Sequence, residues 1–377
     1  AYDVIGSDIQ KESQELRSKI KKVSDITREC AKLAARRESV ALEAESQGHT
    51  VTARENHFIA SMMYGCALWP VWDDDDPNLL LFTEKMTDCY QKYSRTADHL
   101  IERIEIPFES QKIYAYLHLP VNKKEEVTRF PCVVMIPGMD TFKEEMVRLY
   151  GDKFLERGFA VLATDGPGQG ETRARGLKVT KDNFDRAGRS VMDYLVRSEN
   201  ETIDTDKIGI YAQSFGTYWG PRIMAGDKRY TAGVFIYVCH EPGMSTLFNG
   251  SAPRLKPRHM WMTGIYDEDE FDSKYCPELT LKGVGEKISS PVLIAAGEDD
   301  PLSPIKNTFS FFRSISSPKK RLLVYEGEGH GITDPLLQVR VGDFIDDVAK
   351  NREIKPGAYY LERANGWRTE KLFTPPA

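Results

Sequence analysis

Three polar residues of the types used in nucleophilic catalysis follow three separate apolar segments. Ser214 lies in Tyr-Ala-Gln-Ser-Phe-Gly, Asp300 in Gly-Glu-Asp-Asp-Pro-Leu-Ser-Pro, and His330 in Gly-Glu-Gly-His-Gly. A serine hydroxyl is a weak nucleophile until an imidazole removes its proton, and a carboxylate holds that imidazole in the productive tautomer. The three residues, in this order along the chain, predict covalent acyl-transfer chemistry at Ser214.

The segment around Ser214 has the composition of a sharp turn from a strand into a helix. Residues 207–211 suit a buried strand, and residues 215–225 suit a helix. Small residues flank such a serine because the turn brings the strand and helix backbones together. Gly216 fits this requirement, whereas Ala212 stands where glycine is usual. The alternative interpretation is an exposed serine that caps the helix.

Two neighbouring carboxylates are candidates for the orienting acid. The spacing Gly-x-x-Asp-x-x-x-Pro, in which Pro304 opens the following helix, favours Asp300 over Asp299. The alternative for Asp300 is a turn carboxylate that caps this helix.

The glycines around His330 allow its loop to reach the serine. Among the other histidines, His240 closely follows a predicted strand and is a candidate for contact with substrate.

A Pro-Gly-Met-Asp segment at residues 137–140 follows another predicted strand, where half of an oxyanion-binding site is expected. We assign the two donors to the backbone N–H groups of Met139 and Phe215, since loss of one such donor typically slows catalysis about 100- to 1,000-fold. Asp140 is a candidate second acid, with a pKa raised by burial in an apolar pocket near Phe142. The alternative for Asp140 is a carboxylate that braces the loop through backbone hydrogen bonds.

A second glycine-rich segment, Asp-Gly-Pro-Gly-Gln-Gly at residues 165–170, follows the next predicted strand. It lacks the lysine of a phosphate-binding loop, and no helix is expected directly after it. We therefore interpret it as a structural turn beside the site.

These residues require a framework in which strands and helices alternate. A hairpin is expected at residues 103–119, and the last strand and helix at residues 321–325 and 334–349. Continuous apolar strands separated by helices indicate an α/β fold with a mostly parallel sheet flanked by helices. Residues 240–288 form a connection of about 50 residues, too long for a plain crossover, and predict a lid over the site within a catalytic domain of residues 101–377.

Residues 1–100 are predicted to form a helical N-terminal domain that helps to bind substrate. One helix is expected to carry Leu16, Ile20 and Val23 on a single face, and two more helices are expected at residues 52–68 and from Pro77 to about residue 100.

Three aromatic residues near the end of the second helix, Tyr64, Trp69 and Trp72, are candidates for contact with a flat substrate. Packing against the catalytic core is the alternative for all three. The four aspartates at residues 73–76 are interpreted as a solvated turn and helix start, because carboxylates suit the positive end of a helix dipole. We predict no metal site there.

The composition excludes several classes of protein. The formal net charge is −6 and no basic block occurs, which argues against binding of nucleic acid. No apolar stretch suits a membrane span, and residues 1–10 lack the apolar core of a secretion signal. Six scattered cysteines favour reduced thiols and a cytoplasmic protein. No metal or organic cofactor is implied, and the expected partner is a small-molecule substrate.

The chain resembles a group within the α/β-hydrolases. That group contains 2,6-dihydroxypseudooxynicotine hydrolase, the fermentation-respiration switch proteins and fungal polyketide hydrolases of melanin- and fusarin-type pathways. The likeness rests on the N-terminal helices, on Pro-Gly-Met-Asp followed by Lys-Glu-Glu, on the loop at residues 165–170 and on the serine, acid and histidine. It implies an α/β-hydrolase fold with substrate held between the helical domain and the catalytic core. It also implies an acid at Asp140 close to the serine, and often a homodimer.

The resemblance further implies cleavage of a carbon–carbon bond next to a carbonyl. The leading function is therefore hydrolysis of a β-dicarbonyl or acyl-aromatic secondary metabolite, such as a polyketide, through an acyl-enzyme. One alternative is ester or lactone hydrolysis, or ring formation by acyl transfer, at the same serine. An alternative of a different class is a non-catalytic small-molecule binding protein on a hydrolase scaffold.

Overall fold

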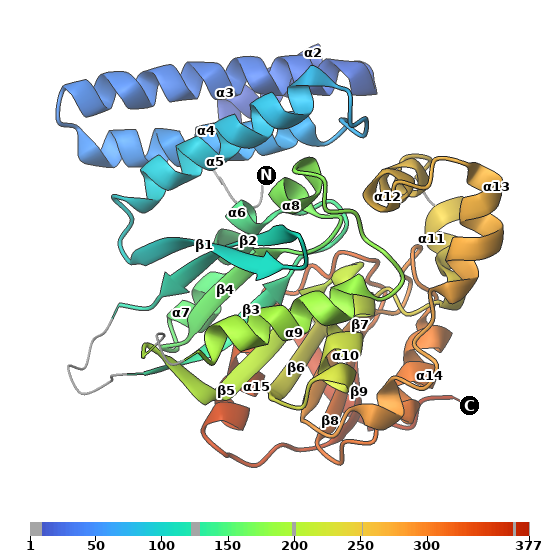
Figure 1. The fold of residues 1–377 in the computed structure, drawn as a ribbon. Coiled ribbons are helices and arrows are strands. Elements are labelled where there is room, and N and C mark those ends of the chain that lie inside the picture. The colour runs from blue at the N-terminus through green and yellow to red at the C-terminus, as the bar shows by residue number, and fades with distance from the viewer. Residues whose placement is uncertain (1–9, 122–128, 198–200, 251, 365–366, 377) are drawn as a thin grey trace.

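The computed structural model describes residues 10–121, 129–197, 201–250, 252–364 and 367–376 (Figure 1). The expectation about a secretion signal in residues 1–10 falls, except for Gln10, outside these ranges. Among the described residues, no helix combines the length and the apolar character that crossing a membrane requires.

One mixed sheet forms the centre of the molecule. Within the described ranges it has ten strands in the order β1-β2-β4-β3-β5-β6-β7-β8-β9-β10. Strands β3 to β9 run parallel to one another, while β1, β2 and β10 are antiparallel to their neighbours. Their bounds are β1 Leu100–Phe108, β2 Gln111–Leu119, β3 Phe130–Ile136, β4 Ala160–Asp165, β5 Ile203–Gln213, β6 Tyr230–Ile236, β7 Val292–Gly297, β8 Lys320–Tyr325, β9 Gly357–Ala364 and β10 Trp367–Phe373.

Helices cover both faces of this sheet, as expected for strands that are apolar on both sides (Figure 1). One face carries α9 (Asn183–Leu195), α10 (Gly216–Gly226) and α14 (Ile305–Ser314). The other carries α15 (Leu337–Ala349) and a helical run made of α6 (Lys143–Met146), a π-helical turn (Val147–Gly151) and α7 (Asp152–Leu155).

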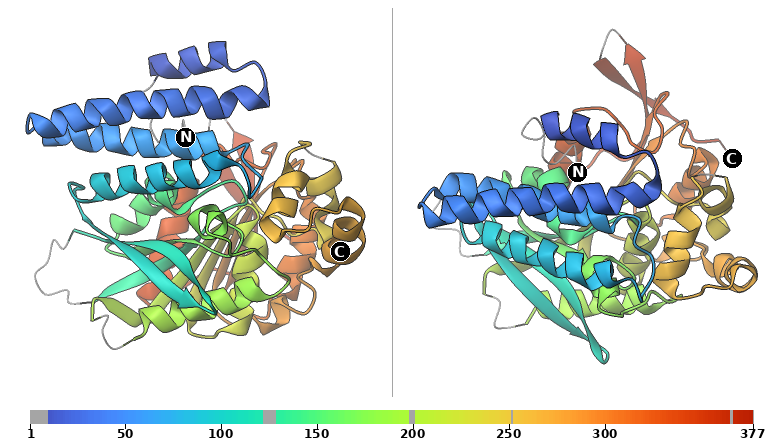
Figure 2. Two further views of the ribbon diagram at one scale, coloured as in Figure 1. Left: turned by 45° about the horizontal axis from the view of Figure 1, so that its top comes forward. Right: turned by 90° about the horizontal axis from the view of Figure 1, so that it is seen from above.

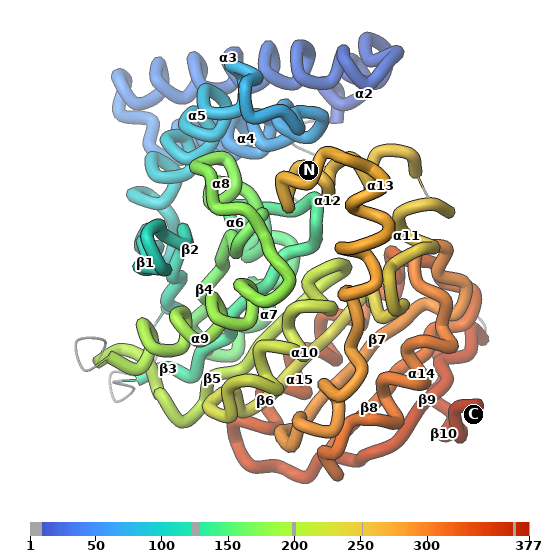
Figure 3. Tube along the Cα trace, turned by 45° about the vertical axis from the view of Figure 1, so that its right-hand side comes forward, coloured from blue at the N-terminus to red at the C-terminus, as the bar shows by residue number. Residues whose placement is uncertain are grey.

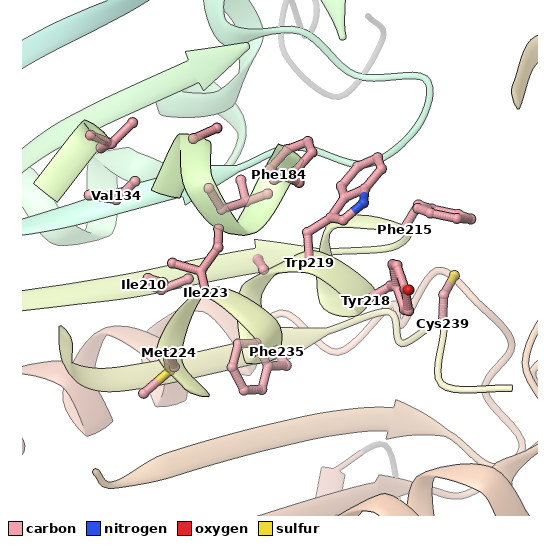
Figure 4. Close-up of a cluster of buried hydrophobic side chains, with 14 of the residues drawn as sticks. Val134, Phe184, Ile210, Phe215, Tyr218, Trp219, Ile223, Met224, Phe235 and Cys239 are labelled. Atoms are coloured by element: carbon pink, nitrogen blue, oxygen red, sulfur yellow. The ribbon is translucent and has the colours of Figure 1, made fainter. Parts of the chain in front are cut away.

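Aromatic packing joins α9 and α10 to the strand that leads to Ser214 (Figure 4). The Phe184 and Trp219 rings stack with centroids 4.1 Å apart, and Phe215 lies against Trp219 at 4.9 Å. Stacked, buried aromatic rings of this kind add stabilisation beyond the area they bury. The turn at Ser214 is therefore set in a rigid part of the core.

The N-terminal helices lie across one end of the molecule, beyond the hairpin of β1 and β2 (Figures 1 and 2). They are packed around a core of their own, which includes Ile59, Met63 and Tyr90. Their bounds are α2 Gln10–Lys19, α3 Val23–Ser46, α4 Thr50–Leu68 and α5 Pro77–Ser94. We refer to α2–α5 as the helical module.

The first helix of this module is interrupted where the sequence predicted a continuous one. Helix α2 ends at Lys19, and Val23 is 50% exposed instead of sharing a buried face with Leu16. The cause is local, because the Asp25 carboxylate accepts hydrogen bonds from the N–H groups of Lys21 and Lys22, both at 3.1 Å. These bonds cap the start of a new helix.

The connection between β6 and β7 is a chain of short helices, which we call the β6–β7 insertion (residues 237–291). It lies beside the helical module and against the sheet (Figures 1 and 3). Its segments are Pro242–Met244, α11 Ser245–Asn249, α12 Leu255–Thr263, α13 Glu268–Glu270, Phe271–Tyr275, Cys276–Glu278 and Gly285–Lys287.

Two further boundaries differ from the sequence prediction. Helix α5 ends at Ser94, and Leu100 already belongs to β1. The sequence also missed β9 and β10, which follow the helix that we expected to be the last element. Strand β10 interleaves charged residues with apolar ones and forms the edge of the sheet, while β9 beside it is only partly buried and carries Glu362 and Arg363 near its end. Solvent-facing side chains therefore weaken the apolar signal of both strands.

Candidate active site

All the predicted polar side chains follow strands of the parallel sheet at their carboxyl ends, the edge where α/β folds bind ligands. Ser214 lies between β5 and α10 and has a φ of 50°. Its N–H donates to the Ile236 carbonyl at 3.0 Å. A Cβ on Gly216 would lie 2.7 Å from the carbonyl oxygens of Ile136 and Pro137, which explains why glycine is needed there. The alternative of an ordinary capping serine does not account for this strained turn.

The structure brings Ser214, His330 and Asp300 into one hydrogen-bonded chain. The Ser214 Oγ lies 2.8 Å from His330 Nε2, and His330 Nδ1 lies 2.8 Å from Asp300 Oδ2. His330 follows β8 and Asp300 follows β7. This geometry lets the imidazole take the serine proton while the carboxylate holds the ring.

The choice between the two neighbouring aspartates is clear in the structure. Asp300 is buried, and its other oxygen accepts the Leu302 N–H at 2.8 Å. Asp299 is exposed, and its backbone N–H bonds to the Glu328 carbonyl at 2.9 Å. Only the Asp300 carboxylate contacts the histidine.

The two candidate oxyanion donors lie on either side of Ser214. Met139 is 5% exposed and Phe215 is fully buried, yet neither N–H donates a hydrogen bond to any residue that the structure describes. A Cβ placed on Gly138 would lie 3.0 Å from the Ser214 Cβ, so the loop of residues 137–142 runs directly beside the serine. Buried N–H groups are rarely left unpaired in proteins, and a developing oxyanion would satisfy them.

The prediction that Asp140 is buried in an apolar pocket is wrong. Asp140 is exposed, so the buried second acid that we assigned to this position loses its physical basis. A buried acid follows this loop in α6, Glu145, which is 5% exposed. Burial raises the pKa of Glu145 to about 7. The sequence offered one signal for Glu145, its position at the third residue of a helix, where it accepts the Phe142 N–H at 3.2 Å.

Arg258 of α12 is a second residue that the sequence analysis missed. Its Nε donates to the Met139 carbonyl at 2.9 Å and its Nη1 to the Trp69 carbonyl at 3.2 Å. Within the described ranges it forms no ion pair, although Asp140 and Glu145 act on it from a greater distance. Desolvation lowers the pKa of Arg258 from its usual value. A guanidinium is therefore fixed beside the oxyanion loop without a paired carboxylate.

The three aromatic residues predicted to contact substrate have different surroundings. Tyr64 is buried inside the helical module, where its hydroxyl donates to Glu38 at 2.7 Å. The Trp72 indole N–H donates to the Trp69 carbonyl at 2.7 Å, and its ring packs on the main core. Trp69 is partly buried, with the Arg254 guanidinium 4.2 Å above its ring. Only Trp69 lies at the junction between the module and the β6–β7 insertion.

His240 is placed away from the chain of Ser214, His330 and Asp300. Its ring lies 4.8 Å from the Phe311 ring of α14 and borders a separate pocket of about 250 Å³. Neither ring nitrogen has a hydrogen-bond partner among the described atoms, and burial lowers the pKa of His240 to about 3. Nothing in this placement supports contact with substrate.

The acidic turn at residues 73–76 is partly a structural junction. Asp76 caps α5 by accepting the Asn78 N–H at 2.8 Å, as predicted. Asp74, however, pairs with Arg173 at 2.7 Å and accepts the Trp261 indole N–H at 2.9 Å. Among the described residues, no group of three or more His, Cys, Asp or Glu side chains is arranged to hold a metal ion.

Comparison with known families agrees with this geometry. The family model described as esterase FrsA-like matches residues 25–236, more than half of the chain. The chain belongs to the FrsA-like esterase family. A second model, that of the prolyl oligopeptidase family, matches residues 149–348 of this FrsA-like chain. Both models describe families of hydrolases.

Several fungal hydrolases are related to this FrsA-like protein. The α/β hydrolase xenA of Xenoacremonium sinensis is 29% identical over 64% of the chain and 56% of its own length. The hydrolyase poxO of Penicillium oxalicum is 28% identical over 52% of the chain and 47% of its own length. The hydrolase acrC of Aspergillus aculeatus is 25% identical over 80% of both chains. The chain therefore spans about half the length of the first two relatives.

Solved structures show the same fold. The structure of 2,6-dihydroxy-pseudo-oxynicotine hydrolase matches with a TM-score of 0.80 and 21% identity, over 94% of this chain and 97% of the other. AbyA5 matches with a TM-score of 0.66 and 17% identity, over 93% and 97%. The predicted α/β-hydrolase fold with N-terminal helices is confirmed, as is the predicted resemblance to this group of hydrolases.

Proposed function

We propose that this FrsA-like protein hydrolyses a carbon–carbon bond next to a carbonyl in a β-dicarbonyl or acyl-aromatic secondary metabolite. The observation that carries the catalytic part of the proposal is the chain of two 2.8 Å contacts from Ser214 through His330 to Asp300. The choice of bond draws on the likeness to the 2,6-dihydroxy-pseudo-oxynicotine hydrolase and to fungal hydrolases.

The reaction would proceed in two halves. His330 takes the Ser214 proton as Oγ attacks the ketone carbon. The resulting oxyanion accepts hydrogen bonds from the N–H groups of Met139 and Phe215. The carbon–carbon bond then breaks, its electron pair leaves with the departing carbon as an enolate, and the proton on His330 neutralises it. Water, deprotonated by His330, then attacks the acyl-enzyme, and His330 returns that proton to Ser214 Oγ as the acyl–oxygen bond breaks and a carboxylic acid is released.

The charge of the leaving group separates this reaction from ester cleavage. An enolate carries much of its negative charge on an oxygen away from the scissile bond, whereas an ester leaving group departs with its charge on the oxygen of the scissile bond itself. Arg258 supports the first case, because its guanidinium is fixed to the Met139 carbonyl and forms no ion pair with a described carboxylate. In a poorly solvated site such a charge stabilises a nearby anion more strongly than it does in water.

The test compares one acyl group in two substrates, an aryl β-diketone and the matching 4-nitrophenyl ester. Arg258→Met should slow cleavage of the diketone by about tenfold or more while sparing the ester, since loss of a charge that acts on the leaving group affects only the reaction that needs it. Arg254→Met is the matched control, because Arg254 packs over Trp69 in the same part of the insertion. Equal losses with both substrates would remove the support for carbon–carbon cleavage.

Two alternatives have distinct signatures in the same experiment. Ester or lactone hydrolysis, or ring formation by acyl transfer, predicts turnover of the ester and none of the diketone. A non-catalytic binding protein predicts that a fluorophosphonate does not label Ser214 and that neither substrate is consumed. A cytoplasmic homodimer acting on a small molecule stays a prediction from the sequence.

A further inference from the structure

The glycine-rich loop of residues 165–170 holds a buried glutamine that contacts the oxyanion loop. Gln169 is 2% exposed. Its Nε2 donates to two successive carbonyls, those of Pro137 at 2.9 Å and Gly138 at 3.0 Å. Its Oε1 accepts the Gly166 N–H at 3.1 Å. Every polar atom of this side chain is therefore used, and the two donated bonds end on the segment that leads into Met139.

The position of the second bond determines the direction of the Met139 N–H. The Gly138 carbonyl and the Met139 N–H belong to the same peptide unit, and no cis peptide occurs among the described residues. In a trans peptide the C=O and N–H bonds point in opposite directions. A donor that holds the Gly138 oxygen on one side thus turns the Met139 N–H to the other. A hydrogen bond to the carbonyl also polarises the peptide and makes its N–H a stronger donor.

The loop that carries Gln169 is itself rigidly held. Asp165 lies at the start of this loop. One of its carboxylate oxygens accepts a hydrogen bond from the backbone N–H of Lys143 and the other accepts one from the N–H of Glu171, each at 2.9 Å. The Lys143 ammonium, fully buried, also contacts Asp165 at 3.1 Å and Glu171 at 2.9 Å. Helix α8 (Gly170–Ala174) begins directly after Gln169, although the sequence analysis expected no helix there. The backbone on both sides of Gln169 is therefore fixed.

We propose that Gln169 is a positioning residue. It orients the Met139 N–H toward the oxyanion that forms when Ser214 attacks, and it polarises the peptide that carries this N–H. The inference rests on the proposed function, because it needs Ser214 to be the nucleophile. Gln169 does not touch the reacting atoms; it acts through the peptide that does.

The experiment measures the second-order rate at which an alkyl fluorophosphonate labels Ser214, located by mass spectrometry, so it needs no natural substrate. Gln169→Met keeps the length of the side chain and removes both donated bonds, and should slow labelling by about 10- to 100-fold, somewhat less than direct loss of an oxyanion donor. Thr172→Val is the matched control, because it removes two bonds in the same segment without touching residues 137–139. Its Oγ1 donates to the Asp165 carbonyl at 2.6 Å and accepts a hydrogen bond from the Tyr114 N–H at 3.1 Å. It should lower the melting temperature and leave the labelling rate within about twofold.

Gln169→Glu adds a readout that a structural role would not produce. A protonated carboxyl can still donate one hydrogen bond to these carbonyls, whereas a carboxylate repels them. The labelling rate of this variant relative to wild type should therefore fall as pH rises from 5 to 8. If Gln169→Met does not fold, this ratio tests whether Gln169 positions the Met139 N–H.

The possible failures are distinguishable. Wild-type labelling rates in folded Gln169→Met, or a ratio for Gln169→Glu that does not change with pH, would overturn the inference alone. Absence of Ser214 labelling in the wild-type protein would overturn the proposed function and the inference together.

Discussion

Ala212 and Gly220 face each other across the contact between β5 and α10, and each accounts for the residue type of the other. A Cβ on Gly220 would lie 2.9 Å from the Ala212 Cβ, closer than such atoms approach in proteins. Ala212 stands where the sharp turn before Ser214 usually has glycine, and the missing side chain at Gly220 provides the space. The departure from the usual motif is therefore compensated on the facing helix.

Gly220→Ala should destabilise the protein by about 1–3 kcal/mol, the usual range for overpacking a core. Ala212→Gly in the same chain should recover part of the loss, since a Cβ at residue 220 would also meet Phe235 at 3.0 Å. Gly226→Ala, at the other end of α10 where nothing lies within 4 Å, is the control and should be close to neutral. Urea unfolding of wild type, Gly220→Ala, Ala212→Gly and the double variant measures the coupling, and strictly additive effects would contradict it.

Asp300→Asn should reduce turnover far more than Asp299→Asn. Loss of the orienting acid of such a triad is worth roughly 10,000-fold in kcat, because the histidine then adopts the wrong tautomer. Asp299 is exposed and its side chain does not contact His330, so its amide variant should stay within a few-fold of wild type. Steady-state kinetics with an activated aryl ester provides the comparison. A larger loss for Asp299→Asn would show that the assignment is reversed.

Asp74→Ala should loosen the junction between the helical module, the catalytic core and the β6–β7 insertion. The change leaves Arg173, which is 1% exposed, without its carboxylate partner. Removing one member of a fully buried pair costs about 3–5 kcal/mol, and since the Asp74 side chain is 40% exposed we expect about 1–3 kcal/mol. Asp75→Ala, an exposed neighbour, is the control in urea unfolding. Equal stability of the two variants would contradict a role for this ion pair.

Tyr64→Phe and Trp72→Phe should lower stability by about 1 kcal/mol each without changing kcat or KM, because each removes a hydrogen bond that is internal to the protein. Trp69→Leu should instead raise KM, since Trp69 lies where the module meets the insertion. Thermal unfolding and steady-state kinetics on the same preparations separate the two effects. A raised KM in Tyr64→Phe would restore the prediction that this residue contacts substrate.

Glu145→Gln should make stability less dependent on pH. Burial raises the pKa of Glu145 from 4.5 in its ordinary state to about 7 in the folded protein. The folded state therefore binds the proton more tightly, and its stability falls as pH rises from about 4.5 to 7, by about 1.4 kcal/mol for each unit of the shift. The variant should gain stability relative to wild type at pH 8 and little at pH 4.5. Urea unfolding at both pH values measures this, with Glu84→Gln on the exposed face of α5 as control; a gain independent of pH would contradict it.

The sequence by itself located the residues whose positions follow from local patterns. Ser214, Asp300 and His330 each follow an apolar strand and precede or lie within glycine-rich turns, so strand periodicity and turn composition were sufficient to place them at one edge of a parallel sheet. The same patterns predicted most strands and helices. They failed at β9 and β10, where charged side chains at and next to the sheet edge hide the strand pattern, and at residues 20–22, where a carboxylate interrupts a helix.

Only the tertiary structure decided which residues surround the serine. Arg258 meets the Met139 carbonyl across 119 positions of the chain, and Gln169 meets Gly138 across 31, distances that leave no spacing pattern in a sequence. The exposure of Asp140 and the burial of Glu145 likewise depend on which neighbouring segments cover them. Hydrogen bonds and desolvation depend on positions in space, and the folded backbone alone brings such distant groups together.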